Sequence, residues 1–136
     1  MSEVPVPPAQ GLTLLIADDS AVMRAMIKRV IGMVDVPIGA ILEAGDGKQA
    51  LALLEQHDVA VLFTDINMPE MTGTELLCEI ERRGCWPHLL RVIISTDGSS
   101  ARREEADALK VRFYLQKPFR PEAMRDVLDA LTSHAD

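Results

Sequence analysis

The chain is poor in cysteine, and its two cysteines do not form a recognisable site. Cys78 and Cys85 have neither the spacing of a metal-binding pair nor a cluster of histidines beside them. A small secreted domain that depends on disulfides would contain more cysteines than this. We therefore expect both residues to be reduced thiols in a cytoplasmic protein.

Long apolar segments and an excess of positive charge are also missing. No apolar run approaches the roughly 18 residues of a membrane-spanning helix, and the N-terminus lacks the basic start and apolar region of a secretory signal. With 14 basic and 21 acidic residues, the net charge is −7. Nucleic acids and anionic membranes attract basic surfaces, so this charge disfavours both as partners. A cation, a basic partner surface, or a phosphoryl group held together with a metal ion suits it better.

The length of 136 residues corresponds to one domain. Prolines at positions 5, 7 and 8 predict that residues 1–11 form a flexible tail, and we expect the domain to occupy residues 12–133. The sequence shows no internal repeat, no linker and no sustained heptad pattern. Nothing in it indicates a second domain.

Short, mostly apolar segments alternate with segments of helical periodicity. The predicted strands are Leu12–Ala17, Gly39–Glu43, Val59–Thr64, Arg91–Ser95 and Arg112–Gln116. The first predicted helix begins near Ser20 and has apolar spacing as far as Val34. The next three span Lys48–Gln56, Gly73–Arg83 and the weakly apolar Ala101–Leu109, and the last begins at Pro121. Strands that are apolar throughout are buried on both faces, which requires a parallel sheet with helices on either side. The predicted fold class is therefore α/β, a doubly wound five-stranded parallel sheet.

Polar side chains stand at the carboxyl ends of four predicted strands, where open parallel sheets bind their ligands. They are Asp18 and Asp19 after the first strand, Asp65 after the third, Ser95 and Thr96 at the end of the fourth, and Lys117 after the fifth. Each residue alone has an ordinary explanation as a helix cap, a loop cap or a surface lysine. Their convergence on one edge of the sheet is what indicates a site.

Three carboxylates in one place indicate a bound cation. Each pair a few ångströms apart repels by about 1–4 kcal/mol at effective dielectric constants of roughly 80 to 20. Oxygen ligands at an open, hydrated edge suit Mg²⁺, which keeps several waters and shares its other positions with a phosphate. Beside Mg²⁺ a carboxylate can attack phosphorus, while Lys117 neutralises charge on the transferring oxygens and Ser95 donates a hydrogen bond to the phosphoryl group.

Several stretches resemble the receiver domain of bacterial response regulators, most closely the single-domain chemotaxis type. They are LLIADDSAVMR, EAGDGKQAL, VLFTDINMPEMTG, VIIST and YLQKPF, and the resemblance extends from about Leu12 to Leu131. The order DDS, D-x-N-M-P-x-M-x-G and K-P-F is highly specific. The resemblance implies a flavodoxin-like (βα)5 fold with strand order 2-1-3-4-5.

The resemblance also implies roles for the acidic residues and the lysine. Asp65 is the phosphoacceptor, and Asp19 and the Asn67 backbone carbonyl complete a Mg²⁺ site with it, with Mn²⁺ as a substitute metal. Asp18 acts on the metal directly or through water. Lys117 pairs with Asp65 and with the phosphoryl oxygens.

A further group of residues matches the family's switching and dephosphorylation positions. By resemblance Ser95 is the switch hydroxyl and Tyr114 the switch aromatic residue, while Asn67 and Asp97 occupy the places that orient a hydrolytic water. Thr96 departs from the family's usual alanine and adds bulk or a second hydroxyl beside the phosphoryl group. Lys110 and Val111 replace a usual Gly-Ala pair, and a left-handed backbone at Lys110 would be mildly strained.

The resemblance implies a signalling module whose only chemistry is its own phosphorylation and dephosphorylation. A histidine kinase or phosphotransfer protein would supply the phosphoryl group. An effector protein would bind the surface formed by the fourth helix, fifth strand and fifth helix. We expect a monomer or a weak phosphorylation-dependent dimer.

Three other classes of protein share parts of this pattern. A Mg²⁺-dependent phosphohydrolase with an aspartate nucleophile usually has D-x-D after the first strand and a cap domain, whereas Asp18 and Asp19 are adjacent and no insertion could form a cap. A flavin-binding module would need a hydroxyl- and glycine-rich phosphate loop where these aspartates would repel phosphate. An interaction module that is never phosphorylated would have little reason to hold all of the site positions.

Overall fold

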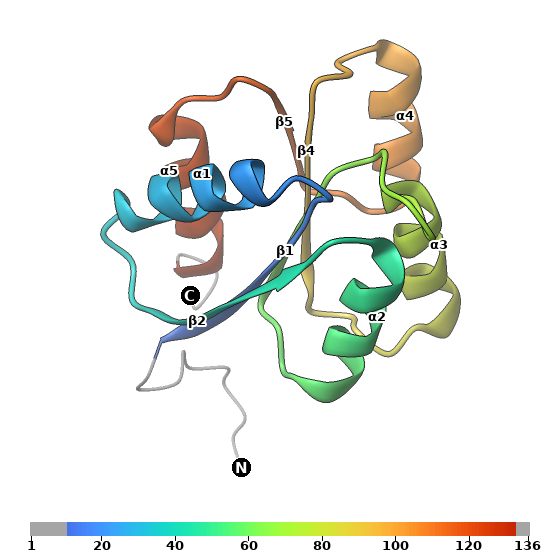
Figure 1. The fold of residues 1–136 in the computed structure, drawn as a ribbon, viewed down its shortest axis with the longest axis horizontal. Coiled ribbons are helices and arrows are strands. Elements are labelled where there is room, and N and C mark those ends of the chain that lie inside the picture. Colours follow the sequence, from blue (N-terminus) through green and yellow to red (C-terminus); the bar gives the residue numbers. More distant parts are fainter. Residues whose placement is uncertain (1–10, 133–136) are drawn as a thin grey trace.

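The computed structural model describes residues 11–132, in which strands and helices alternate along the chain (Figure 1). The strands are β1 (Leu12–Ala17), β2 (Ile38–Ala44), β3 (Val61–Thr64), β4 (Leu90–Ser95) and β5 (Phe113–Gln116). The helices are α1 (Ala21–Gly32), α2 (Gly47–Gln56), α3 (Gly73–Arg83), α4 (Ser100–Ala108) and α5 (Pro121–Thr132). Apart from Gly11, the predicted tail lies outside the described residues, as does residue 133 at the end of the predicted domain. Among residues 11–132, no helix combines the length and apolar character that crossing a membrane requires.

The strands form one parallel sheet in the order β2-β1-β3-β4-β5. This confirms the predicted doubly wound α/β fold and the strand order that the resemblance implied. Since all strands run in the same direction, their carboxyl ends lie at one edge of the sheet. The loops after β1, β3, β4 and β5 therefore begin side by side.

Two apolar layers hold the helices against the sheet, because successive strand residues point to opposite faces. Leu14 and Ile16 of β1 pack in one layer with residues of α1 and α5. Leu15 and Ala17 pack in the other with residues of α2, α3 and α4. Figure 1 shows α1 and α5 on one side of the sheet and α2, α3 and α4 on the other.

The edge strands differ from the predicted pattern of full burial. β2 is half-buried to exposed as far as its last residue, Ala44, and β5 is at most half-buried. An edge strand has a neighbour on one side only, and the helices concentrate over the centre of the sheet. Burial on both faces holds for β1, β3 and β4, whose residues are buried with the exceptions of Thr13 and Leu90.

Several element boundaries also differ by one or two residues from those predicted. β3 begins at Val61 rather than Val59, although the Ala60 backbone N–H donates to the Thr13 carbonyl at 2.8 Å. Helix α1 ends at Gly32, so Val34 lies beyond the helix and is buried in the turn that follows. Apolar spacing alone predicted a longer helix because a buried turn residue satisfies the same pattern.

Helix α4 is attached to the body by few buried side chains. Ala106 is its buried residue, in keeping with the weak apolar pattern of this segment. The chain leaves the helix through Lys110, whose φ of 64° lies in the left-handed region that glycine adopts most easily. Lys110, which replaces the family's usual glycine, therefore has the left-handed backbone that is mildly strained for a residue other than glycine.

Candidate functional site

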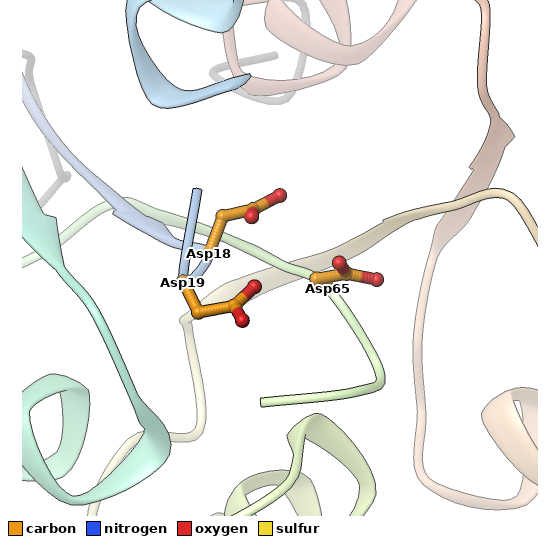
Figure 2. Close-up of side chains that lie close together, drawn as sticks. All are labelled: Asp18, Asp19 and Asp65. Atoms are coloured by element: carbon orange, nitrogen blue, oxygen red, sulfur yellow. The ribbon is translucent and has the colours of Figure 1, made fainter. Parts of the chain in front are cut away.

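Three carboxylates converge at the carboxyl edge of the sheet. Asp18 and Asp19 follow β1, Asp65 follows β3, and one carboxylate oxygen from each lies within 4.8 Å of the others. Figure 2 shows the three side chains close together, with Asp18 and Asp19 side by side at the end of β1 and Asp65 opposite them. The adjacency of β1 and β3 in the sheet produces this cluster, since the Asp65 backbone N–H continues the ladder to the Ala17 carbonyl at 2.9 Å.

Local hydrogen bonds orient the two less exposed carboxylates. Asp18 is 2% exposed, and its Oδ1 accepts from the Ser20 backbone N–H at 2.9 Å. Asp65 Oδ1 accepts from the Ile66 backbone N–H at 2.7 Å. Asp19 is exposed and completes the open side of the cluster. Each bonded carboxylate therefore keeps its second oxygen directed into the site.

Lys117 joins these second oxygens across the site. Its ammonium lies 3.1 Å from Asp18 Oδ2 and 3.3 Å from Asp65 Oδ2, and the side chain is largely buried. The residue follows β5, and its backbone N–H donates to the Ser95 carbonyl at 2.8 Å. The Lys117 ammonium thus pairs with two of the three carboxylates, so the cluster retains net negative charge.

The loop after β3 approaches the start of α3 very closely. The Gly73 backbone N–H donates to the Ile66 carbonyl at 2.7 Å, and a Cβ at Gly73 would lie 1.9 Å from the Asp65 carbonyl oxygen. Any larger residue would displace the loop that carries Asp65. Thr72 caps the same helix through a reciprocal capping box with Glu75.

The donor set of the cluster fits a hard divalent cation. Carboxylate oxygens from three residues surround one space, and the exposed Asp19 leaves that space open to water. Mg²⁺ prefers oxygen ligands and keeps part of its hydration shell, whereas a fully enclosed cage would suit it poorly. Asn67 is exposed in the loop two residues after Asp65.

The residues at the end of β4 form a second group beside the carboxylates. Ser95 is 1% exposed, and its hydroxyl accepts from the Asp97 backbone N–H at 3.1 Å. Tyr114 of β5 donates its hydroxyl hydrogen to the Asp97 carbonyl. Ser95 and Tyr114 therefore meet through the backbone of Asp97. Thr96 is exposed, and its carbonyl accepts from Gln116 Nε2 at 3.4 Å.

Two titratable residues of this second group, Tyr114 and Asp97, have shifted pKa values. Burial, together with the charge of Asp97, raises the pKa of Tyr114. The Ser99 backbone N–H, the Ser99 hydroxyl and Arg102 lower the pKa of the Asp97 carboxyl. Asp97 Oδ1 accepts from Ser99 N–H at 3.0 Å, while Arg102 lies 3.5 Å from Oδ2. Ser99 itself, rather than Asp97, is the N-cap of α4.

Two features near the site were missed by the sequence analysis. Arg24 donates to the Asp18 carbonyl at 2.5 Å and pairs with Glu43 at 2.9 Å, so it ties the end of β1 to β2. An apolar hollow of about 200 Å³ lies beside Lys117, lined by Met23, Met26, Thr96, Lys117, Pro118 and Phe119. Met26 is 50% exposed and the neighbouring Val22 78% exposed. The signal in the sequence that could have revealed this hollow is the presence of apolar residues on the outer face of α1.

A parallel sheet of order 2-1-3-4-5 with an acidic cluster at its carboxyl edge places the chain in the flavodoxin-like class of α/β proteins. The model of the response regulator receiver domain matches residues 14–129. The chain belongs to the family of response regulator receiver domains, which confirms the resemblance noted in the sequence.

Individual relatives agree with this assignment. A chemotaxis protein CheY homolog of Campylobacter jejuni is 38% identical over 124 residues, covering 87% of this chain and 90% of the relative. Chemotaxis protein CheY1 of Helicobacter pylori is 34% identical over 128 residues, covering 92% and 100%. The structure of the chemotaxis response regulator CheY4 of Vibrio cholerae aligns with a TM-score of 0.74 at 28% identity, covering 90% of this chain and 97% of that one. The protein is thus a signalling module of the response regulator type.

Proposed function

We propose that this protein is a stand-alone receiver that accepts a phosphoryl group on Asp65 in a Mg²⁺-dependent reaction. The observation that supports it most directly is the cluster of Asp18, Asp19 and Asp65 with Lys117 bridging two of them. A site that merely stabilised the fold would balance its charges. This one gathers repelling carboxylates at an open edge, where a cation and a phosphoryl group complete it.

The metal would be held by Asp19, Asp65 and the backbone carbonyl of Asn67, with Asp18 acting directly or through a water. When bound, Mg²⁺ supplies positive charge to the oxygens of the transferring phosphoryl group. Mn²⁺ would serve as a substitute because it takes the same oxygen ligands. Asp18 is already turned toward the site by its bond from Ser20 N–H, so it needs no rearrangement to take part.

Asp65 would act as the nucleophile through a carboxylate oxygen. A bond forms between this oxygen and phosphorus, while the bond between phosphorus and the imidazole nitrogen of the donor histidine breaks and that nitrogen keeps the electron pair. Lys117 stands 3.3 Å from Asp65 Oδ2 and so balances negative charge on the phosphoryl oxygens. The bond from Ile66 N–H to Oδ1 fixes the orientation of the carboxylate.

Phosphorylation would then act on Ser95 and Tyr114. A phosphoryl group offers the Ser95 hydroxyl a charged acceptor, so its bond from Asp97 N–H would weaken as the hydroxyl turns. Since Asp97 also accepts from Tyr114, movement at Ser95 would reach the aromatic ring. Thr96 adds bulk beside the same phosphoryl group.

The lifetime of the phosphoryl group would depend on Asn67 and Asp97. Hydrolysis requires a water in line with phosphorus, and an amide and a carboxylate beside that line can orient it. Asn67 is exposed two residues after Asp65, so its amide could turn toward such a water. The Asp97 carboxylate is engaged by Ser99 and Arg102, so it would have to leave Arg102 to contact the water.

The phosphodonor would be a histidine kinase or a phosphotransfer protein. Its histidine must reach Asp65, so we expect its surface to cover the hollow beside Lys117, which the exposed Met26 and the half-buried Phe119 line. The effector protein would bind the surface of α4, β5 and α5. We expect the protein to be a monomer or a weak phosphorylation-dependent dimer.

The biological setting follows from the relatives. Several of them are named as chemotaxis proteins, so we propose chemotaxis or motility as the pathway. A location in the cytoplasm agrees with kinase-dependent signalling. The chain would turn over no substrate beyond its own phosphoryl group.

The test is covalent modification measured by intact mass after incubation with acetyl phosphate. The expected result is one added phosphoryl group in the presence of Mg²⁺, and none in EDTA or in Asp65→Asn. Mass is a more suitable readout than tryptophan fluorescence, because Trp86 lies before β4, at the end of the sheet opposite the site, where its ring N–H donates to the carbonyl of Leu54 in α2.

Lys117→Ala provides a second variant that separates chemistry from signalling. It removes the ammonium but no carboxylate, so it should keep the fold and much of the Mg²⁺ affinity while losing phosphorylation-dependent binding to the effector. Phosphorylation of Asp65→Asn at the parent's level would disprove the assignment of the phosphoacceptor. Unchanged effector binding in phosphorylated Lys117→Ala would reduce this lysine to a structural role.

A further inference from the structure

The Tyr114 ring of β5 is contacted by groups from two other segments, the loop after β4 and helix α4. The ring belongs to β5, its hydroxyl donates to the carbonyl of Asp97 in the loop after β4, and the guanidinium of Arg103 in α4 lies over its face. The distance from Arg103 Cζ to the ring centroid is 4.6 Å. A guanidinium at this range attracts the electron-rich face of an aromatic ring.

Arg103 is anchored to the same loop that accepts the Tyr114 hydroxyl. Its Nε donates to the Gly98 carbonyl at 3.3 Å, and Gly98 directly follows Asp97. The loop also lies close against β5, since a Cβ at Gly98 would meet Gln116 Oε1 at 2.2 Å. Arg103 therefore lies over the Tyr114 ring and donates to the Gly98 carbonyl, which is next in the chain to the Asp97 carbonyl that the Tyr114 hydroxyl contacts.

A line of contacts runs from this arginine to the end of β4. Arg103 contacts Tyr114, Tyr114 contacts the Asp97 carbonyl, and the Asp97 N–H contacts the Ser95 hydroxyl. Ser95 is buried at the carboxyl edge of the sheet, in the strand next to the one that carries Asp65. This series of contacts connects Arg103, an exposed residue of α4, to Ser95 at the same edge of the sheet as the carboxylate site.

We propose that Arg103 is a positioning residue that holds the Tyr114 ring against the Asp97 carbonyl and so sets how far the ring moves when the site is occupied. The contacts of Arg103 with the ring and with Gly98 involve α4, β5 and the loop between β4 and α4. The ring is therefore biased toward the held position by the helix itself. Loss of the guanidinium leaves the ring with its hydroxyl contact and its packing against the apolar core, but with no cation over its face.

The size of the bias follows from the strength of a partly exposed contact between a cation and a ring. Removing it should lower the ratio of held to displaced ring about two- to fivefold. Because Arg103 is exposed on α4, its replacement leaves the core intact. The second half of the proposal, the coupling to the occupied site, rests on the proposed function, whereas the first half does not.

Tyr114 is the single tyrosine of the chain, which makes the test specific. Protein made with tyrosine isotopically labelled in the ring gives NMR ring signals from this residue alone. We expect the signals of Arg103→Met to shift toward those of free tyrosine, and those of Arg103→Lys to return part of the way because an ammonium is also attracted to the ring. Arg112→Met is the matched control, since it removes a guanidinium 5.6 Å from the centroid of a different ring, Phe113.

Unchanged ring signals in Arg103→Met, or an equal shift in Arg112→Met, overturn the positioning role. A second arm adds Mg²⁺ and beryllofluoride, a phosphoryl mimic, and should move the ring signals further in Arg103→Met than in the parent. Equal movement in both proteins overturns the coupling. If fluorine NMR detects no bound beryllofluoride in the parent, the proposed function fails, and the comparison without the mimic still decides the role of Arg103.

Discussion

The carboxyl and amino ends of the strands, here called the carboxyl and amino edges of the sheet, carry charged clusters of opposite composition. At the carboxyl edge, the Lys117 ammonium pairs with Asp18 and Asp65, and Asp19 adds a third carboxylate to the cluster. At the amino edge, the single carboxylate of Glu81 lies between Arg91 at 2.6 Å and Lys110 at 2.9 Å. The first cluster repels itself and lies open, whereas the second is internally paired and partly buried.

The difference indicates which cluster serves function and which serves stability. Arg91 is 6% exposed and also donates to the carbonyls of Leu109 and Trp86, at 3.1 and 3.4 Å. Its two terminal nitrogens thereby join the ends of α3, α4 and the loop before β4, while its buried Nε has no hydrogen-bond partner among the described residues. The carboxylates at the other edge gain full compensation only with a ligand. Substitutions at the two edges should therefore change stability in opposite directions.

The largest effect on stability is expected at the amino edge. Arg91→Met leaves the Glu81 carboxylate and two carbonyls without this donor, and should lower the free energy of unfolding by about 2–3 kcal/mol. Urea denaturation followed by circular dichroism measures it. Arg82→Met is the matched control, because Arg82 forms an exposed ion pair with Glu79 and its loss should change the free energy of unfolding much less. Equal losses in both variants would remove the distinction between buried and exposed pairing.

At the carboxyl edge the sign should reverse. Asp19→Asn removes one of three mutually repelling carboxylates and should raise the free energy of unfolding without metal by about 1 kcal/mol. Mg²⁺ should stabilise the parent more than the variant, because the parent has the larger repulsion to relieve. Thermal unfolding with and without Mg²⁺ tests both statements. A variant less stable than the parent in EDTA would mean that Asp19 makes a stabilising contact.

The dephosphorylation rate should separate the residues around the open edge. Asp97→Ala and Asn67→Ala should slow loss of the phosphoryl group several-fold, because each removes a group proposed to orient the hydrolytic water. Thr96→Ala should leave the rate unchanged or increase it, since a methyl replaces a bulkier side chain beside the site. Intact mass measured over time after removal of the phosphodonor gives the three rates. If the first two variants decay at the parent's rate, their assigned role is wrong.

The smallest effect concerns acid stability at the amino edge. The hydrogen bond from Arg91, then that from Lys110, lowers the pKa of Glu81 below its usual value of 4.5. A lowered pKa in the folded state means that the carboxylate stabilises the fold above the unfolded pKa and that this contribution is lost as the pH falls below it. The stability of Glu81→Gln should therefore depend less on pH in this acid range than that of the parent. Parallel pH profiles for the two proteins would contradict the pairing.

Most of the fold could be predicted from the sequence because it depends on short-range patterns. The apolar runs Leu12–Ala17 and Arg91–Ser95 bounded strands closely, and Ser20 was correctly expected to cap α1. Errors arose where a residue serves tertiary packing rather than its own element. Val34 fits a helical period but lies in a buried turn, and β2 and β5 are edge strands that their composition did not distinguish.

The residues at the site were named in advance for a similar reason, since strand ends mark one edge of a parallel sheet. Contacts between residues that are far apart in the chain could not be predicted from the sequence. Arg24 contacting the Asp18 carbonyl, and Arg103 lying over Tyr114, depend on the angle at which a helix rests on the sheet. No local pattern contains that angle.

By itself, the sequence determined the class of the protein and the chemical character of its site. Buried strands alternating with helices admit few arrangements, and DDS, D-x-N-M-P and K-P-F specify which side chains stand at the strand ends. The tertiary structure alone decided which of these groups touch and which remain exposed. Lys117 reaches both Asp18 and Asp65, and Arg91 satisfies three segments at once, because packing brings together groups that are distant along the chain. Hydrogen bonds and ion pairs act over a few ångströms, so their partners are set by the folded positions of the atoms rather than by their order in the sequence.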